Sequence, residues 1–231
     1  MSLFLFFLSS YFYCKNPPTI ARLPTFLTNH PITRNREGKI KYIGVSELSS
    51  STLRRAHAIH PIHAAQYEYN PWTLDIEQES GTYLLSTCQE LGISVFAYSP
   101  LGRGIMTGRY RSAADFTEPG DARALLPRYQ GNNFKKNLEL VDSFAEVAKN
   151  KKSCTSGQLV LAWLLAQDER LFVIPGTKKI PYLEENFAAA RVTLTEDEER
   201  YLRELVSEAG GMSGGRGAMF TVFADTASLE E

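Results

Sequence analysis

The sequence has few cysteines and almost no net charge, and these two absences exclude several classes of protein. Its three cysteines are odd in number and show no C-x-x-C spacing, which argues against a disulfide framework and against a structural zinc site. The 25 basic and 26 acidic residues leave a net charge of -1, which gives no electrostatic reason to expect nucleic acid or an anionic membrane as a partner. We therefore expect a protein of a reducing compartment that binds neither.

Long hydrophobic runs are also missing where a membrane or secretory segment would need them. The apolar run in residues 1–14 is far shorter than the roughly 20 residues that span a bilayer. A secretory signal would begin with a basic region, yet no Lys or Arg precedes Lys15, and no A-x-A-like site follows. We expect residues 1–36 to be an irregular segment outside the fold, or a hydrophobic plug for it, with a poor signal sequence as the alternative. Four prolines support irregular structure there, at Pro17, Pro18, Pro24 and Pro31.

From Gly38 onward, strands, polar loops and helices follow one another. Strands are predicted at residues 39–45, 63–68, 93–97 and 171–174. Helices are predicted at about residues 49–59, 79–91, 137–151, 155–165, 183–187 and 196–205. This alternation implies right-handed βαβ units and a parallel sheet. Because a closed (β/α)8 barrel needs eight strands, we predict an α/β fold that is a partial TIM barrel of about four parallel strands with their helices, over residues 37–209.

The predicted helix ends and faces rest on particular residues. Serines 49–51 are N-cap candidates for a helix that carries Leu53, Ala56 and Ile59 on one face. Capping sequences begin at Thr155 and Thr195 and end three residues later in Gln158 and Glu198. Cys88 shares a helical face with Leu84, Leu85 and Leu91, so we expect it in the core.

Two segments break this regularity. Residues 105–134 mix arginines with Pro and Gly, and a loop of that length in a compact domain is often functional, such as a lid over a site. A solvated surface excursion is an equally good interpretation. Residues 210–231 are rich in glycine, and we expect a loop or disordered tail there.

The loops that follow the predicted strands carry groups suited to a dinucleotide. Gly176 would let the backbone approach a phosphate, and Thr177 would add a hydroxyl beside the ammonium groups of Lys178 and Lys179. Residues 99–104 could line a pyrophosphate. A planar heterocycle could stack on Tyr98, although a tyrosine at this place is more often part of the core. The carboxamide of a cofactor could accept or donate hydrogen bonds at Ser46 and Gln66, which could equally be local caps.

Three histidines, His57, His60 and His63, lie three residues apart on or beside a predicted helix. That spacing invites a metal interpretation, but no acidic partners lie nearby. We therefore predict no metal site.

Four segments together resemble the aldo-keto reductases. They are G-K-I-K-Y-I-G-V-S at residues 38–46, Q-Y-E-Y-N-P at 66–71, A-Y-S-P-L-G at 97–102, and I-P-G-T-K-K at 174–179 with L-E-E-N at 183–186. They occur in the order and at the spacing of that family, over about residues 36–205, and are most similar to its pyridoxal reductase-like or YakC-like branch. The resemblance implies a cytoplasmic, NADP(H)-dependent oxidoreductase that reduces aldehydes or ketones to alcohols.

Roles for individual residues are implied by the same resemblance. Ser46 and Gln66 would hold the nicotinamide carboxamide, and Tyr98 would stack on the ring. The 2′-phosphate would fall to Gly176, Thr177 and Lys178. The pyrophosphate would be bound by Ser99, Leu101, Gly102 and Gly104. The adenine would be bound by Glu185 and Asn186. The sequence departs from the family pattern twice: Glu47 stands where many members have Asn, and Tyr182 stands where several have an Arg on the 2′-phosphate.

The family's catalytic Asp, Tyr, Lys and His have no counterpart that we can assign. Neither a D-x-A-x-x-Y-G segment nor an H-R-x-D segment occurs before Gly38, and His30 is not in a comparable setting. We therefore name no catalytic residue, and we expect a truncated family member with little or no turnover. One alternative is a non-catalytic NADPH-binding or barrel-completing regulatory subunit, which would self-associate or bind a partner chain through open sheet edges. Another is an incomplete gene model.

Overall fold

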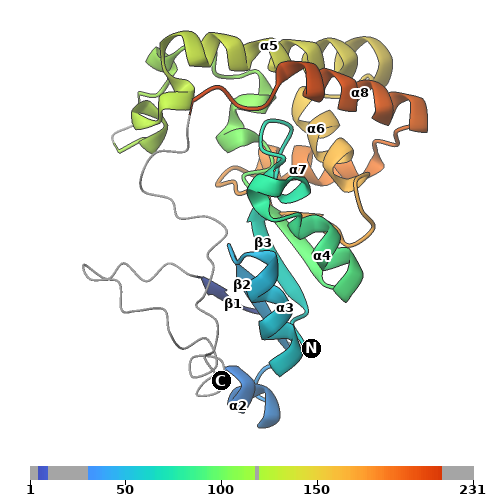
Figure 1. The fold of residues 1–231 in the computed structure, drawn as a ribbon. Coiled ribbons are helices and arrows are strands. Elements are labelled where there is room, and N and C mark those ends of the chain that lie inside the picture. The colour runs from blue at the N-terminus through green and yellow to red at the C-terminus, as the bar shows by residue number, and fades with distance from the viewer. Residues whose placement is uncertain (1–4, 10–30, 118–119, 215–231) are drawn as a thin grey trace. The chain divides into compact units, whose positions relative to one another are not determined.

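The structure is a computed structural model that describes residues 5–9, 31–117 and 120–214 (Figure 1). These residues group into two compact units. The first unit contains the described residues up to Tyr67 together with Asp75–Phe96, and the second contains Glu68–Leu74 together with the described residues from Ala97.

Five strands form one sheet in the order β1-β2-β3-β4-β5. They are β1 (Leu5–Ser9), β2 (Tyr42–Ser46), β3 (Ala64–Glu68), β4 (Ser94–Tyr98) and β5 (Leu171–Val173). The β1–β2 and β2–β3 pairs are parallel, as predicted for the strands that follow residue 38. β1 lies in the segment that we expected to be irregular. Its apolar residues have strand propensity, but a run this short does not reveal its partner, because pairing depends on tertiary context.

The first unit places helices between its strands. They are α2 (Pro31–Arg36), α3 (Ser50–Ile59) and α4 (Leu84–Leu91). α2 corrects the prediction of irregular structure up to residue 36. The N-cap of α3 is Ser49, whose side chain accepts a hydrogen bond from the backbone N–H of Thr52 at 3.2 Å. Leu53 is fully buried in that helix, but Ile59 is 44% exposed because it is the last helical residue, so the predicted apolar face ends one turn early.

The predicted helix at residues 79–91 is broken near its start. A 3₁₀ turn at Glu79–Gly81 is separated from α4 by Thr82 and Tyr83, which both have left-handed backbone angles, with φ of 58° and 51°. Two such residues in succession cannot continue a right-handed helix. Cys88 of α4 is fully buried, which confirms the prediction that it belongs to the core.

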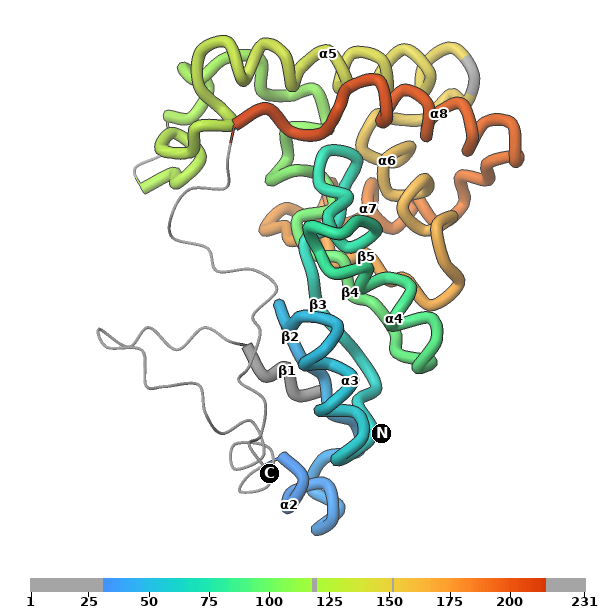
Figure 2. Tube along the Cα trace, in the orientation of Figure 1, coloured from blue at the N-terminus to red at the C-terminus, as the bar shows by residue number. Residues whose placement is uncertain are grey.

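Helices dominate the second unit. They are α5 (Gly131–Val147), α6 (Ser156–Leu165), α7 (Ile180–Ala188) and α8 (Glu196–Ala209), with a π-helical turn at Ala148–Lys152 after α5. α5 and α8 pack side by side (Figures 1 and 2). The ring of Phe144 on α5 meets Trp163 on α6 edge-on, with centroids 6.3 Å apart, and both side chains are fully buried. α5 begins six residues before the predicted Asn137, so the irregular excursion is shorter than expected.

Short 3₁₀ turns account for most of the remaining excursion. They lie at Gly102–Thr107, Ala113–Asp115, Ala122–Leu125 and Pro127–Tyr129. Both predicted capping boxes, at Thr155 and Thr195, are present. In each, the threonine hydroxyl accepts from a backbone N–H three residues on, and that residue's side chain accepts from the threonine N–H.

After α8, residues 210–214 run back along the second unit. The N–H of Met212 donates to the carbonyl of Trp72 at 3.1 Å, and the N–H of Ser213 donates to Oδ1 of Asn137 at 2.8 Å. The start of the predicted tail is thus tied to the fold, while residues 215–231 lie outside the described residues. No helix within the described ranges has the length and apolarity needed to cross a membrane.

Candidate functional site

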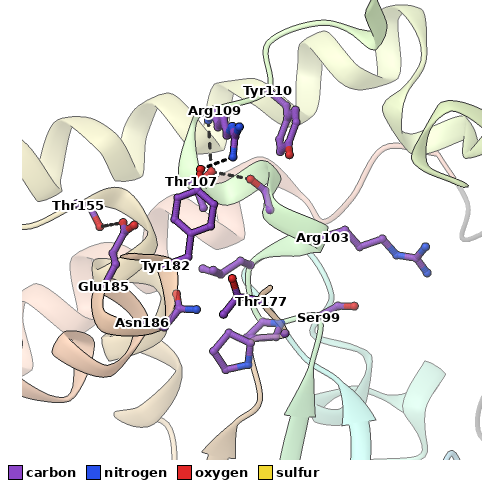
Figure 3. Close-up of a pocket in the computed structure, with 15 residues that line it drawn as sticks. Ser99, Arg103, Thr107, Arg109, Tyr110, Thr155, Thr177, Tyr182, Glu185 and Asn186 are labelled. Atoms are coloured by element: carbon purple, nitrogen blue, oxygen red, sulfur yellow. Dashed lines mark hydrogen bonds between the residues drawn. The ribbon is translucent and has the colours of Figure 1, made fainter. Parts of the chain in front are cut away.

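A cavity of about 580 Å³ lies in the second unit, where the loops after β4 and β5 meet the start of α7 (Figure 3). It has fifteen lining residues, which are Ser99, Pro100, Leu101, Arg103, Gly104, Thr107, Arg109, Tyr110, Thr155, Pro175, Gly176, Thr177, Tyr182, Glu185 and Asn186. Two strand exits that we singled out from the sequence, those of β4 and β5, therefore line one cavity.

The loop after β4 forms one wall of this cavity, and its shape follows from unusual backbone angles. Ser99, Gly102, Arg103 and Gly104 all have positive φ, between 49° and 88°. The loop winds on itself, since the N–H of Gly102 donates to the carbonyl of Ser99 and that of Gly104 donates to Leu101, both at 2.9 Å. This winding presents Ser99, Leu101 and Gly104 to the cavity.

Gly102 does not line the cavity and instead packs behind the loop. A Cβ at this position would lie 2.5 Å from Cζ3 of Trp72, and φ is 54°. The hydroxyl of Tyr129 also donates to the carbonyl of Gly102, at 3.1 Å. The glycine is therefore required by close packing in the second unit.

The loop after β5 contributes Gly176 and Thr177 to the cavity. A Cβ on Gly176 would meet nothing within 4 Å, so the backbone there faces open space. The hydroxyl of Thr177 accepts from the N–H of Lys179 at 3.2 Å, which fixes the turn before α7. Lys178 is exposed and is not among the lining residues.

Glu185 and Asn186 line the same cavity as Gly176 and Thr177 and reach it from α7. Oε1 of Glu185 accepts a hydrogen bond from the hydroxyl of Thr155, at 2.6 Å. The side-chain amide of Gln158 donates to the backbone carbonyl of Glu185 at 3.2 Å. The capping box of α6 thus also holds α7 in place.

Eight of the fifteen lining residues were not among the predicted cofactor contacts, and two of these eight, Arg109 and Tyr182, contact each other. The guanidinium of Arg109 donates to the hydroxyl of Tyr182 and lies 5.5 Å from the centre of its ring. The ring of Tyr110 lies 5.6 Å from the same guanidinium. Arg109 was visible in the sequence as one of the arginines of residues 105–134, and Tyr182 as a departure from the family pattern. Neither signal indicated that the two side chains would meet.

Tyr110 is held from its other side by an ion pair. The guanidinium of Arg123 lies 4.2 Å from the centre of the Tyr110 ring and 2.6 Å from Oδ2 of Asp121. Hydrogen bonding to Arg123 lowers the pKa of Asp121, and the same interaction raises the pKa of Arg123, so the pair stays charged. The charged groups that line the cavity itself are Arg103, Arg109 and Glu185. Two positive groups against one negative group suit an anionic ligand.

The remaining predicted residues lie elsewhere. Tyr98 ends β4 half-buried and is not among the lining residues. Ser46 and Gln66 belong to the first unit, where the Ser46 hydroxyl donates to the backbone carbonyl of Gln66 at 3.2 Å. Glu47, next to Ser46, is 1% exposed with φ of 56°. Within the described ranges, His, Cys, Asp and Glu side chains form no group of three that could hold a metal ion.

Strands that alternate with helices and end in polar loops around one cavity define an α/β protein, and comparison with known proteins identifies its family. The model of the aldo/keto reductase family matches residues 33–207. The chain belongs to that family, which confirms the resemblance seen in the sequence motifs.

Two curated relatives are similar over most of this chain. Aldo-keto reductase str7 of Strobilurus tenacellus is 50% identical over 187 residues, 80% of this chain and 55% of that protein. Aldo-keto reductase yakc of Schizosaccharomyces pombe, named as an NADP(+) enzyme, is 48% identical over 193 residues, 82% of this chain and 55% of that protein. The chain thus spans about half the length of these relatives.

Solved structures confirm the fold class. A thermostable aldo-keto reductase with the inhibitor epalrestat matches with a TM-score of 0.57 and 28% identity, over 87% of this chain and 59% of that one. A glycerol dehydrogenase of Gluconobacter oxydans matches with a TM-score of 0.68 and 23% identity, over 81% of this chain and 55% of that one. The second likeness concerns the fold alone.

Proposed function

We propose that this chain binds NADP(H), with the cavity of the second unit holding the phosphate-bearing adenosine part of the cofactor. One observation carries the proposal: seven of the residues selected from the sequence as cofactor contacts line this single cavity. They are Ser99, Leu101, Gly104, Gly176, Thr177, Glu185 and Asn186. The cavity has the size of a small-molecule site and a positive balance of charge. The name of the yakc relative, which carries NADP(+), supports the same cofactor.

In this proposal the two loops divide the cofactor between them. Ser99, Leu101 and Gly104 lie along the pyrophosphate, while Gly176 and Thr177 approach the 2′-phosphate and Glu185 and Asn186 the adenine. When bound, NADPH supplies a hydride for reduction of a carbonyl. The proposal also keeps Ser46 and Gln66 for the carboxamide and Tyr98 for the nicotinamide ring. Gly102 and Lys178 do not line the cavity, and their roles toward the pyrophosphate and the 2′-phosphate stay predictions from the sequence alone.

Binding is tested by titrating NADPH against the purified chain and following the fluorescence of the reduced nicotinamide. We expect a saturable change that Thr177→Ala and Asn186→Ala each weaken by about three- to tenfold, because each removes a hydrogen-bonding group. Thr193→Ala serves as the control, since Thr193 is exposed and outside the cavity. The absence of saturable binding at millimolar NADPH would refute the proposal.

For catalysis, we propose that the chain has little or no turnover of the small aldehydes or ketones that its family reduces. We can assign no Asp, Tyr, Lys and His group of the family's type in the sequence, and so no proton donor toward the carbonyl oxygen. The assay is NADPH oxidation with 4-nitrobenzaldehyde or pyridoxal. Turnover at an ordinary enzyme rate, on the order of 1 per second or above, would contradict this part of the proposal. We also propose a cytoplasmic location, supported by the low cysteine content, which a fluorescent fusion in the source cell would test.

A second candidate function is that of a barrel-completing regulatory subunit that self-associates or binds a partner chain. It is favoured by exposed apolar side chains on β5, directly after β5 and on α7, which are Phe172, Ile174, Ile180, Leu183 and Phe187, between 37% and 74% exposed. β5 is also the last strand in the sheet order. Large exposed apolar patches and open sheet edges favour association.

Sedimentation equilibrium of the full chain tests this second function. We expect self-association that Leu183→Ser with Phe187→Ser reduces, with Leu125→Ser as a control because Leu125 is 84% exposed but outside the group. A monomer at all accessible concentrations, with no partner required for solubility, would count against it.

A further inference from the structure

A 2′-phosphate is a dianion, and Lys178, the predicted source of its counter-charge, is not among the residues that line the cavity. From the sequence, we assigned this counter-charge to Lys178, because Tyr182 stands where several family members have an arginine on the 2′-phosphate. Yet Lys178 is absent from the lining residues, whereas Tyr182 is one of them. If the cavity binds such a phosphate, positive charge has to reach it from another part of the chain.

Arg109 brings a guanidinium to the position that Tyr182 occupies. It lies beyond the loop after β4 and is far from Tyr182 in sequence, but its Nη1 donates a hydrogen bond to the Tyr182 hydroxyl. Figure 3 shows the two side chains meeting on the same side of the cavity as Tyr110. The Tyr182 ring also lies 5.8 Å from Nζ of Lys179, so the aromatic ring gathers two cations near the start of α7.

Within the described part of the chain, the charge of Arg109 is not neutralised by a carboxylate, and its hydrogen-bond acceptor is a neutral phenol. Neighbouring arginines of the same segment differ in this respect. Arg111 makes a bidentate ion pair with Asp142, at 2.7 and 2.9 Å, and Arg123 pairs with Asp121. Arg109 therefore differs from its neighbours in being available to an anionic ligand.

Among the described residues, Glu185 is the one carboxylate that lines the cavity, and it already accepts a hydrogen bond. Oε1 of Glu185 accepts from the Thr155 hydroxyl at 2.6 Å, which directs it toward the cap of α6. In Figure 3, Glu185 lies on the Thr155 side of the cavity, while Arg109 lies on the side of Thr107 and Tyr110. A phosphate could thus approach the guanidinium without displacing that contact.

We propose that Arg109 is the phosphate-binding residue that selects NADP(H) over NAD(H) in this chain, and that Tyr182 is the residue that positions it. This inference rests on the proposed function and deepens it. A planar guanidinium binds two phosphate oxygens at once, and a charge-assisted bond to a dianion is stronger than its present bond to a phenol hydroxyl. The irregular segment that follows β4 would then take part in cofactor binding through Arg109.

The test compares NADPH and NADH, which differ only in the 2′-phosphate, in fluorescence titrations of the full chain. We expect Arg109→Gln to weaken NADPH binding about tenfold and to leave NADH binding unchanged. Tyr182→Phe keeps the ring and removes the hydroxyl, so it should weaken NADPH binding by less than Arg109→Gln does. Arg111→Gln is the matched control in the same segment and should bind both cofactors as the unmodified chain does.

A second arm separates the two kinds of phosphate in the cofactor. Adenosine 2′-monophosphate and adenosine 5′-monophosphate are titrated as competitors, and circular dichroism confirms that each variant is folded. Selective loss of the 2′-monophosphate in Arg109→Gln supports the inference. Equal loss of both cofactors, selective loss of the 5′-monophosphate, or no change would overturn it. If the unmodified chain binds NADPH and NADH equally well, selection by Arg109 is wrong while the proposed function stands, and if it binds neither, both fail.

Discussion

Gly102 is the residue at which the backbone angle and the packing of the candidate site are most tightly coupled. Its φ of 54° and the 2.5 Å that would separate a Cβ from the Trp72 ring leave no room for a side chain. The sequence S-P-L-G predicts a bend at this glycine, but it does not predict which group the glycine packs against. Whether a glycine faces a ligand or a buried indole depends on how the loop folds over its neighbours.

Substitution of Gly102 tests this account of the loop. Gly102→Ala should lower the free energy of unfolding by about 2 kcal/mol, because it adds an overpacked methyl group to a strained backbone position. Urea unfolding followed by tryptophan fluorescence measures the change. Gly176→Ala is the matched control, since a Cβ there meets nothing within 4 Å, and it should cost far less. Equal losses for the two variants would show that the Trp72 contact is not the cause.

His63 predicts a pH dependence in the first unit. Burial lowers the pKa of His63 below its usual 6.5, and the neighbouring charges of His60 and His57 lower it further. The folded chain then binds this proton less readily than the unfolded chain, so the contribution to stability is present above pH 6.5 and is lost as the pH falls through the folded pKa.

Unfolding free energies at pH 7.5 and 5.5 measure this effect. We expect the unmodified chain to lose more stability over that interval than His63→Asn, which keeps an acceptor for the N–H of Ile43 but does not titrate. A loss in His63→Asn as large as in the unmodified chain would remove His63 as the source.

Elements were predicted best where one local rule decides their ends. The capping boxes at Thr155 and Thr195 are sequence patterns that the helix ends satisfy directly, and both are confirmed. The break before α4 was missed because Thr82 and Tyr83 have no sequence preference for a left-handed backbone, which tertiary contacts impose. Thr82, for example, accepts a hydrogen bond from the N–H of Ser50 at 2.9 Å.

The cap of α8 gives a prediction at this scale. Thr195→Ala should destabilise the chain by about 1 kcal/mol, because the N–H of Glu198 loses its acceptor at the helix start. Thr193→Ala, an exposed threonine two residues before the cap, should change stability by less than about 0.5 kcal/mol. Chemical unfolding of the pair provides the comparison, and indistinguishable midpoints would contradict the capping role.

At the scale of the whole molecule, the alternation of strand, loop and helix predicted a parallel α/β fold, and the family match confirms it. Ten of the cofactor contacts expected from the sequence fall in the second unit, and two, Ser46 and Gln66, fall in the first. The division into two units and the strand β1 were not predictable, because they depend on contacts between distant segments. The direction in which an exposed side chain such as Arg109 points could not be predicted either, because a sequence pattern places a residue on a loop but does not determine its side-chain orientation.

The central claim is that the loops after β4 and β5 bind one cofactor in one cavity. Hydrogen exchange of the full chain, measured by mass spectrometry with and without saturating NADPH, tests it most directly. We predict slower exchange in peptides that cover residues 99–109 and 174–186, with little change in α8. Unchanged exchange in both loops, or protection confined to other segments, would contradict the account.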